Sequence, residues 1–314
     1  MQLESPTSRR RRPRTVVLAF VAFVVFGFLI ARGADPAKPG SDTDHTDSGI
    51  AFIKAGDWDK AIHELSEAIR VDSKYVRAYE YRGMAYFAKG DMDGALSDFN
   101  RVIQLDPTNE GVLFNRANVY RAKHKPDEAL ADFNQCLLLN PKNTNALLIR
   151  AWIYRSQNKF PEAISDCSAA LRLNPQDIRG LQLRGYCHRM EGHFEQALRD
   201  DREVTRMDPE NAEVFKEIAW ILATCSDQSF RNGTNAVAAA TKACELNHWK
   251  SWQYMDALAA AYAEAGDFQE AVKYEQRAMK LRGSQGNEYR QMRQRLFLYQ
   301  DGKAYREVTK PSSS

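Results

Sequence analysis

The 314-residue sequence contains none of the motifs that mark common catalytic or cofactor sites. It has no Gly-rich phosphate loop, no G-x-S-x-G nucleophile elbow and no H-E-x-x-H metal motif. His188 and His193 are five positions apart, so they do not share a helical face. We therefore expect a protein that is not an enzyme, with no catalytic residue, no cofactor and no metal site.

Cysteine is scarce, and the cysteines occur singly. No C-x-x-C pair is present, no histidine stands at metal-ligand spacing, and the total is odd. This pattern excludes a disulfide framework and favours small apolar side chains in a core. We expect burial of all five: Cys136, Cys167, Cys187, Cys225 and Cys244.

The chain has little excess of positive charge, and that excess lies in one short segment. The formal net charge is +3, and five arginines lie within residues 9–14. Without them the chain is slightly acidic, whereas a nucleic-acid-binding surface needs basic residues gathered on the folded body. We expect no nucleic-acid partner.

A single long apolar run follows this basic N-terminal segment, residues 1–14. Residues 15–31, TVVLAFVAFVVFGFLIA, carry no charge and would span about 26 Å as a helix, slightly less than a hydrocarbon core of about 30 Å. We expect a single-pass transmembrane helix, or signal anchor. The preceding arginines predict a cytoplasmic N-terminus and a folded body on the non-cytoplasmic (periplasmic or extracytoplasmic) side. Cleavage of residues 1–33 as a signal peptide is the alternative, with the same sidedness.

Residues 32–44 are rich in Gly, Pro and Asp and are expected to form a flexible tether.

The sequence after the tether contains an internal repeat. Pro107, Pro141, Pro175 and Pro209 stand 34 residues apart. An alanine precedes each proline by 12 positions, and a glycine or alanine precedes it by 24. Small residues at these positions let two antiparallel helices approach closely, and proline ends the unit because it cannot continue a helix.

This 34-residue helix–turn–helix pattern resembles the tetratricopeptide repeat family. The resemblance implies an all-α, right-handed α-solenoid of about seven helical hairpins over residues 45–285, with a capping helix and frayed tail at 286–314. The last two units and the tail resemble bacterial, planctomycete-like repeat proteins. The sixth unit carries five extra residues in its turn. The expected units are 42–75, 76–109, 110–143, 144–177, 178–211, 212–251 and 252–285.

Four units also repeat an arginine in the first helix and an aspartate sixteen positions later in the second. A catalytic group would occur once rather than four times, so we interpret the pairs as structural. Their bidentate geometry favours Arg over Lys. Pairing between adjacent units stays open, since Glu64 also precedes Arg82 suitably. The expected ion pairs are Arg82–Asp98, Arg116–Asp132, Arg150–Asp166 and Arg184–Asp200.

In the tetratricopeptide repeat family the first helix of each hairpin lines the inner groove. Carried over by position, the resemblance implies a groove with arginines at equivalent places beside aromatic side chains, a combination that peptide-binding hot spots favour. An extended segment with acidic and aromatic or apolar residues would suit it. Arginines that are merely solvated are the alternative. The expected groove residues are Asn118, Arg121, Trp152, Arg155, Tyr186, Arg189 and Trp220.

Together these features predict a membrane-anchored scaffold for protein–protein interaction, anchored by residues 15–31. We expect it to bind peptide segments or partner proteins on its concave face during assembly of a complex. The alternative is a secreted or envelope structural protein that self-associates through its repeats without binding peptides. The sequence identifies neither the partner nor the oligomeric state.

Overall fold

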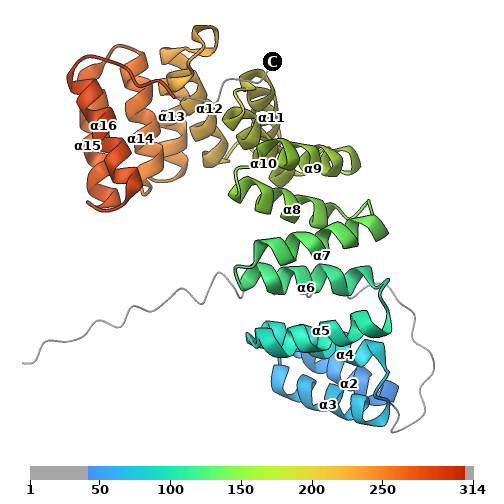
Figure 1. The fold of residues 1–314 in the computed structure, drawn as a ribbon. Helices are drawn as coiled ribbons and strands as arrows, with labels where there is room; N and C mark the ends of the chain where they lie inside the picture. The colour runs from blue at the N-terminus through green and yellow to red at the C-terminus, as the bar shows by residue number, and fades with distance from the viewer. Residues whose placement is uncertain (1–41, 308–314) are drawn as a thin grey trace, which may run out of the picture. The chain divides into compact units, whose positions relative to one another are not determined.

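A computed structural model describes residues 42–307 of the chain. These residues form fifteen α-helices and one short 3₁₀ helix, and they contain no strand (Figure 1). The basic segment 1–14, the expected transmembrane helix 15–31, most of the tether and the last seven residues lie outside the described part. Within residues 42–307, no helix is both long and apolar enough to cross a membrane.

The helices fall into two compact units, which divide between Pro141 and Lys142. In each unit, consecutive helices pack as hairpins joined by short turns. The first unit comprises α2 (Asp42–Ala55), α3 (Trp58–Val71), α4 (Val76–Lys89), α5 (Met92–Leu105), α6 (Glu110–Ala122) and α7 (Pro126–Leu139).

The second unit adds an irregular hairpin and a final unpaired helix to the same plan. The five extra residues of the sixth repeat form the 3₁₀ helix η1 (Gln228–Phe230) and its flanks. Its α-helices are α8 (Thr144–Ser156), α9 (Phe160–Leu173), α10 (Ile178–Met190), α11 (Phe194–Met207), α12 (Ala212–Thr224), α13 (Gly233–Leu246), α14 (Trp252–Glu264), α15 (Phe268–Arg282) and α16 (Asn287–Gln300).

The turns within hairpins contain residues that adopt a positive φ readily. Gly90 and Asn158 both have positive φ, at 92° and 57°, which glycine and asparagine adopt more readily than other residues. After Gly90, the carboxylate of Asp91 accepts a hydrogen bond from the backbone N–H of Gly94 at 2.9 Å and so caps α5. Local chemistry therefore both ends the first helix and begins the second.

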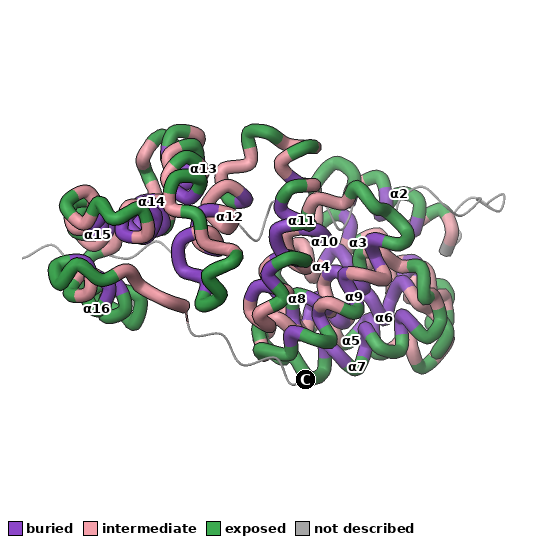
Figure 2. The backbone as a smooth tube through the Cα atoms, turned by 90° about the horizontal axis from the view of Figure 1, so that it is seen from above, coloured by how far each residue is buried: buried purple, intermediate pink, exposed green. Residues whose placement is uncertain are grey.

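The repeated small residue permits the close helix contact that the sequence predicted. A Cβ atom placed on Gly83 would lie 2.6 Å from Cε1 of Phe99, so only glycine fits opposite this ring. Phe99 and Val102 are fully buried in the core of the first unit, where each large apolar side chain contributes about 2 kcal/mol of transfer free energy. Figure 2 shows buried residues along the sides on which helices meet. All five cysteines are also buried, as expected.

The structure differs from the sequence-based boundary where the repeats begin, and it adds a feature after the last helix. α2 begins at Asp42, so the last three residues assigned to the tether are helical. α16 lies in the segment expected to cap the array, with Met292 and Tyr299 fully buried. The tail expected to fray, residues 310–314, lies outside the described residues. Before it, the non-helical residues 303–307 pack back onto α12, where the backbone N–H of Glu307 donates to the carbonyl oxygen of Thr224.

Candidate functional site

The repeated Arg–Asp pairs form within hairpins. Arg82 donates Nε and Nη2 to the two carboxylate oxygens of Asp98 at 2.8 and 2.7 Å. The same bidentate contact is made at 2.8 and 2.6 Å by Arg116 with Asp132, at 2.7 and 2.6 Å by Arg150 with Asp166, and at 2.8 and 2.7 Å by Arg184 with Asp200.

The arginine also reaches the preceding hairpin. Nη1 of Arg82 donates to Oγ of Ser66 at 3.0 Å, and Nη1 of Arg116 donates to Asn100 at 2.7 Å. Glu64, the alternative partner considered for Arg82, lies 2.8 Å from His45 instead. Nη1 of Arg184 likewise donates to Oγ of Ser168 at 3.3 Å, so these three guanidinium groups each link two consecutive repeats.

In the first unit the expected groove residues are largely turned inward. Asn118 is buried, and its Nδ2 donates to the carbonyl oxygen of Phe114 one turn earlier in α6, at 2.9 Å. Arg121 is half-buried, and burial lowers the pKa of its guanidinium. Asn118 is thus occupied by its own helix, which sequence position could not indicate.

In the second unit the expected aromatic and basic residues meet. The guanidinium of Arg155 lies 4.0 Å from the ring centroid of Tyr186, and that of Arg189 lies 5.3 Å from it. Trp152 is about half exposed, at 49%. This part of α8 and α10 presents an exposed tryptophan beside a half-buried contact of Arg155 with Tyr186, on the first helices of successive hairpins, which pack beside one another.

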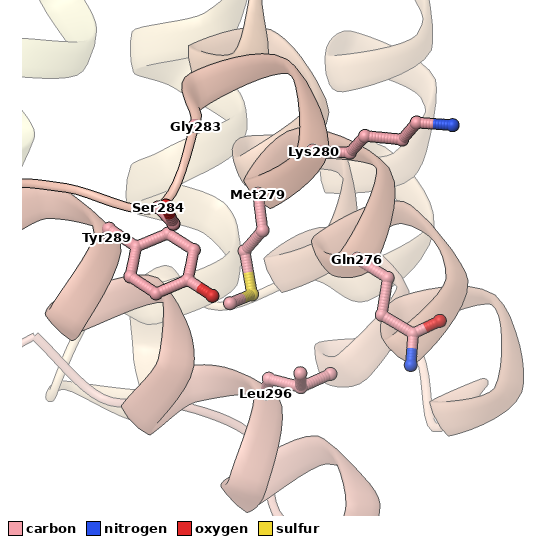
Figure 3. A pocket seen from close by; sticks show the side chains of 7 residues that line it. All are labelled: Gln276, Met279, Lys280, Gly283, Ser284, Tyr289 and Leu296. Atoms are coloured by element: carbon pink, nitrogen blue, oxygen red, sulfur yellow. The ribbon is translucent and has the colours of Figure 1, made fainter.

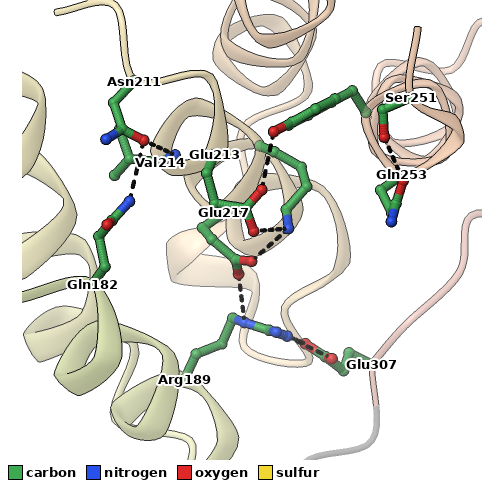
Figure 4. A network of polar contacts seen from close by, with 11 residues as sticks. Gln182, Arg189, Asn211, Glu213, Val214, Glu217, Ser251, Gln253 and Glu307 are labelled. Atoms are coloured by element: carbon green, nitrogen blue, oxygen red, sulfur yellow. Dashed lines mark hydrogen bonds and ion pairs between the residues drawn. The ribbon is translucent and has the colours of Figure 1, made fainter. Parts of the chain in front are cut away.

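Arg189 is buried rather than open to a ligand, contrary to the expectation for a groove cation. Its Nη1 donates to both carboxylate oxygens of Glu307, at 2.7 and 2.8 Å. Its Nε lies 3.1 Å from Glu217 in an ion pair without hydrogen-bond geometry (Figure 4). Burial alone would lower the pKa of Arg189, but the carboxylates of Glu217 and Glu307 raise it well above its usual value.

Glu217 belongs to a wider polar network on α12. Lys216 pairs with Glu217 at 2.8 Å and also with Glu213, which accepts a hydrogen bond from the hydroxyl of Tyr254 at 3.1 Å. Burial would raise the pKa of Glu217, yet Arg189 and Lys216 hold it below its ordinary value. An ionised carboxylate is therefore kept in place beside Arg189.

Residues 305–307 lie against the C-terminal ends of α10, α12 and α14, which are the first helices of three successive hairpins. The ring of Tyr305 packs on that of Trp220 with centroids 6.2 Å apart. Arg306 pairs with Glu264 of α14 at 2.6 Å and donates to the carbonyl oxygen of Ala223 at 3.3 Å. The backbone N–H of Glu307 donates to the carbonyl of Thr224 at 2.8 Å. We call this surface the tail-binding site; it comprises Arg189, Glu217, Trp220, Ala223, Thr224, Glu264 and Arg295.

The insertion of the sixth repeat supports this site. Arg231, just after η1, donates its Nε to Glu264 at 3.1 Å, and its Nη1 donates to the carbonyls of Cys225 and Ser226 at 3.0 and 3.1 Å. Glu264 is thereby fixed between Arg231 and Arg306. The longer loop thus positions an anion that holds the tail.

The sequence analysis did not identify Glu217, Glu264, Arg295 or Glu307 as parts of a site. For Glu217 a signal existed, because the positions 34 and 68 residues earlier hold Leu183 and Ile149. A carboxylate at a position that is apolar in the two preceding units marks an unusual environment. Glu307 gave no such signal, since it lies beyond the last repeat.

Two further carboxylates replace core residues in the second unit. Asp201 stands at the repeat position that Phe99 and Phe133 fill, and it is 3% exposed. Burial, together with the nearby Glu217 and Asp200, raises its pKa well above the ordinary value. Glu275 holds the equivalent position in the seventh hairpin, where burial and Asp256 likewise raise its pKa, and Arg295 lies 3.4 Å away.

A separate cavity of about 420 Å³ lies between α15 and α16. Met279, Tyr289 and Leu296 provide its apolar lining, and Lys280 extends away from them (Figure 3). None of the expected groove residues lines it. Within residues 42–307, no cluster of three or more His, Cys, Asp or Glu side chains is arranged to hold a metal ion.

Hairpins repeated at a fixed period, with first helices packed side by side, define a helical-repeat protein. Models described as tetratricopeptide repeat match residues 46–110, 114–178 and 253–283, together about half of the chain. The chain therefore belongs to the tetratricopeptide repeat family, whose members are scaffolds and are generally not enzymes.

Solved structures share the fold. A tetratricopeptide repeat protein from Parabacteroides merdae matches with a TM-score of 0.55 and 16% identity, over 82% of this chain and 98% of its own. The structure of MamA matches with a TM-score of 0.50 and 19% identity, over 55% of this chain and 94% of its own. The structure of YrrB, described as having an unusual peptide-binding site, matches with a TM-score of 0.50 and 17% identity, over 55% of this chain and 89% of its own. These identities show the fold alone. A comparison with curated proteins found no significant match.

Proposed function

We propose that this protein is a scaffold that binds a segment of a partner protein on the first-helix face of its repeats. The supporting observation is that this face already holds a peptide segment, residues 305–307, through an aromatic contact, an ion pair and a backbone hydrogen bond. Aromatic and acidic residues in the bound segment match the ligand chemistry expected for the groove. Partner binding then needs no new kind of contact.

The neighbouring surface on α8 and α10 extends the same chemistry. Trp152 is about half exposed, and Arg155 lies on the ring of Tyr186. An exposed tryptophan near an arginine–tyrosine contact supplies contact area and charge, which is what hot spots of protein interfaces use. We assign Trp152, Arg155 and Tyr186 to partner contact.

We further propose that residues 15–31 anchor the scaffold in a membrane, with the repeats on the non-cytoplasmic side. The uncharged run and the arginines before it support this arrangement. A scaffold held there would gather partners of one assembly near the bilayer.

Crosslinking of the full chain in its native membrane, followed by affinity capture, tests partner binding. Trp152→Ala/Arg155→Glu should lose the captured partners. Arg172→Glu, a charge reversal at an exposed position on α9, is the matched control and should retain them. If the natural chain and both variants captured identical partners, the assignment of Trp152, Arg155 and Tyr186 to partner contact would be refuted. Capture of copies of the chain alone would favour self-association.

Alkaline extraction of membranes tests the anchor. The intact chain should stay with the lipid, and deletion of residues 15–31 should release it. A mature protein whose mass lacks residues 1–33 would instead support the secreted alternative.

A further inference from the structure

The tail-binding site contacts two side chains that are two positions apart in the bound segment. Tyr305 lies against Trp220, and the guanidinium of Arg295 is 5.5 and 5.6 Å from the centroids of the Trp220 and Tyr305 rings. Two positions later, the carboxylate of Glu307 accepts from Arg189. An aromatic slot and a cationic slot therefore accept residues two positions apart.

The hydrogen bond from the backbone N–H of Glu307 to Thr224 does not depend on which side chains the ligand carries. Ala223 and Thr224 are the last residues of α12, where helical carbonyls lack an N–H partner four residues on. The N–H of Glu307 and the side chain of Arg306 satisfy these two carbonyls. A backbone N–H from another chain would serve Thr224 equally well, so selectivity comes from the side chains, among which Tyr305 and Glu307 contact Trp220 and Arg189.

The charge balance at Arg189 also calls for an acid. Its guanidinium is almost fully buried with one fixed carboxylate, Glu217, at 3.1 Å. Lys216 is paired with both Glu217 and Glu213, whereas Glu307 is the carboxylate that accepts hydrogen bonds from the guanidinium of Arg189. A neutral ligand residue would leave part of a buried charge without a partner, which is costly.

We propose that the partner segment bound here carries an aromatic residue followed two positions later by Glu or Asp, and that Tyr305–Glu307 is an internal occupant which this segment displaces. The inference rests on the proposed function and specifies its ligand. Because the tail belongs to the same chain, its effective concentration is high, on the order of millimolar. A competing segment therefore binds with an apparent affinity reduced by the fraction of sites that are free.

The test uses the full chain in detergent and a fluorescein-labelled peptide DGKAYRE, the sequence of residues 301–307, with an amidated C-terminus. Fluorescence anisotropy compares the natural chain with Tyr305→Ala/Glu307→Gln. The variant should bind the peptide at least about tenfold more tightly, because its own tail no longer competes. Asp301→Asn is the matched control, since Asp301 pairs only weakly with Lys303 at 3.4 Å, and it should bind as the natural chain does.

Substituted peptides test the chemistry. Replacing the tyrosine by alanine, or the glutamate by glutamine, should each weaken binding to the tail variant by about tenfold or more. The peptide should also raise the melting temperature of the variant, which verifies a folded site. Should the double variant fail to fold, Glu307→Gln alone, which keeps the Tyr305 contact, carries the same comparison.

If the natural chain and the tail variant bound the peptide with equal affinity, the proposal that Tyr305–Glu307 is an internal occupant would be overturned. Indifference to the glutamate would overturn the aromatic-x-acid pattern. If the natural chain and the tail variant instead form mixed dimers in size-exclusion chromatography, the ligand is the tail of a second copy, and the partner proposal fails. The crosslinking experiment with Trp152→Ala/Arg155→Glu tests the proposed function independently of these outcomes.

Discussion

Arg189 and Glu307 form an ion pair across 118 positions of the chain, with Nη1 donating to both carboxylate oxygens at 2.7 and 2.8 Å. Repeat arrays usually gain their stability from contacts between neighbouring hairpins. This pair instead joins the first helix of the fifth hairpin to the segment beyond α16. It therefore couples elements that repeat-to-repeat packing leaves independent.

Glu307→Gln should lower the free energy of unfolding of the second unit by about 2 kcal/mol, because a charge-assisted bond to a buried guanidinium is lost. Hydrogen exchange in denaturant measures the effect, and the amides of α10 and α12 should exchange faster. Asp301→Asn should leave these rates unchanged. Unchanged protection of α10 in Glu307→Gln would show that the ion pair does not couple the segments.

Glu264 is held by Arg231 of the insertion at 3.1 Å and by Arg306 of the tail at 2.6 Å. Glu264→Gln should therefore raise amide exchange in two separate segments, residues 226–232 and 303–307, by several-fold. Glu270→Gln is a suitable control, since Glu270 pairs with Lys273 at the surface. An effect confined to one of the two segments would show that they are not linked through this carboxylate.

The Arg–Asp pairs can be separated into charge and packing effects. Asp132→Ala should destabilise the first unit by about 2 kcal/mol, because Arg116 is left half-buried without its bidentate partner. Arg116→Leu/Asp132→Leu should recover most of that loss, since apolar replacement of both partners is often neutral. Urea denaturation of the three chains measures it. A double variant less stable than the single one would show that the pair itself contributes strongly.

The five thiols should be unreactive in the folded protein. All are buried, and burial raises the pKa of Cys187 and of Cys244 to about 12, so almost no thiolate is present at neutral pH. A chromogenic disulfide reagent at pH 8 should modify fewer than one thiol per folded chain and all five in denaturant. Rapid reaction of the native protein would indicate that the hairpins open readily.

The repeat unit could be predicted from the sequence because its determinants are local. Gly83 must be small where Phe99 packs, and Gly90 must take a positive φ in the turn, so both recur at the period of the hairpin. The sixteen-residue spacing of Arg82 and Asp98 likewise lies inside one hairpin. Periodicity reports such contacts directly.

The tail-binding site could not be predicted in the same way. Periodicity suggested a place for Arg189 on the groove side, yet the partner that buries it, Glu307, is non-repetitive and distant in sequence. Asn118 was placed correctly on a first helix, but its amide bonds its own backbone at Phe114. Position along a repeat fixes a face of the helix and leaves the rotamer and any long-range partner open.

Asp201 offers the sharpest pH test, because it stands where Phe99 and Phe133 fill the core in earlier repeats. Its pKa in the folded chain is raised well above the ordinary value of 3.8 by burial, with Glu217 and Asp200 adding to the effect against Arg189 and Lys216. The folded state therefore binds more protons than the unfolded state above about pH 4, and stability falls as the pH rises from there through the folded pKa.

Asp201→Asn removes this dependence while keeping the shape of the side chain. It should stabilise the second unit at pH 7 by more than the roughly 0.5 kcal/mol typical of surface substitutions, and by less as the pH approaches 4. Thermal melts between pH 4 and pH 8 measure the difference, with the exposed Glu195→Gln as the control. A loss of stability at pH 7 would mean that the ionised form of Asp201 is stabilised by its surroundings, which is the opposite of what its burial beside Glu217 requires.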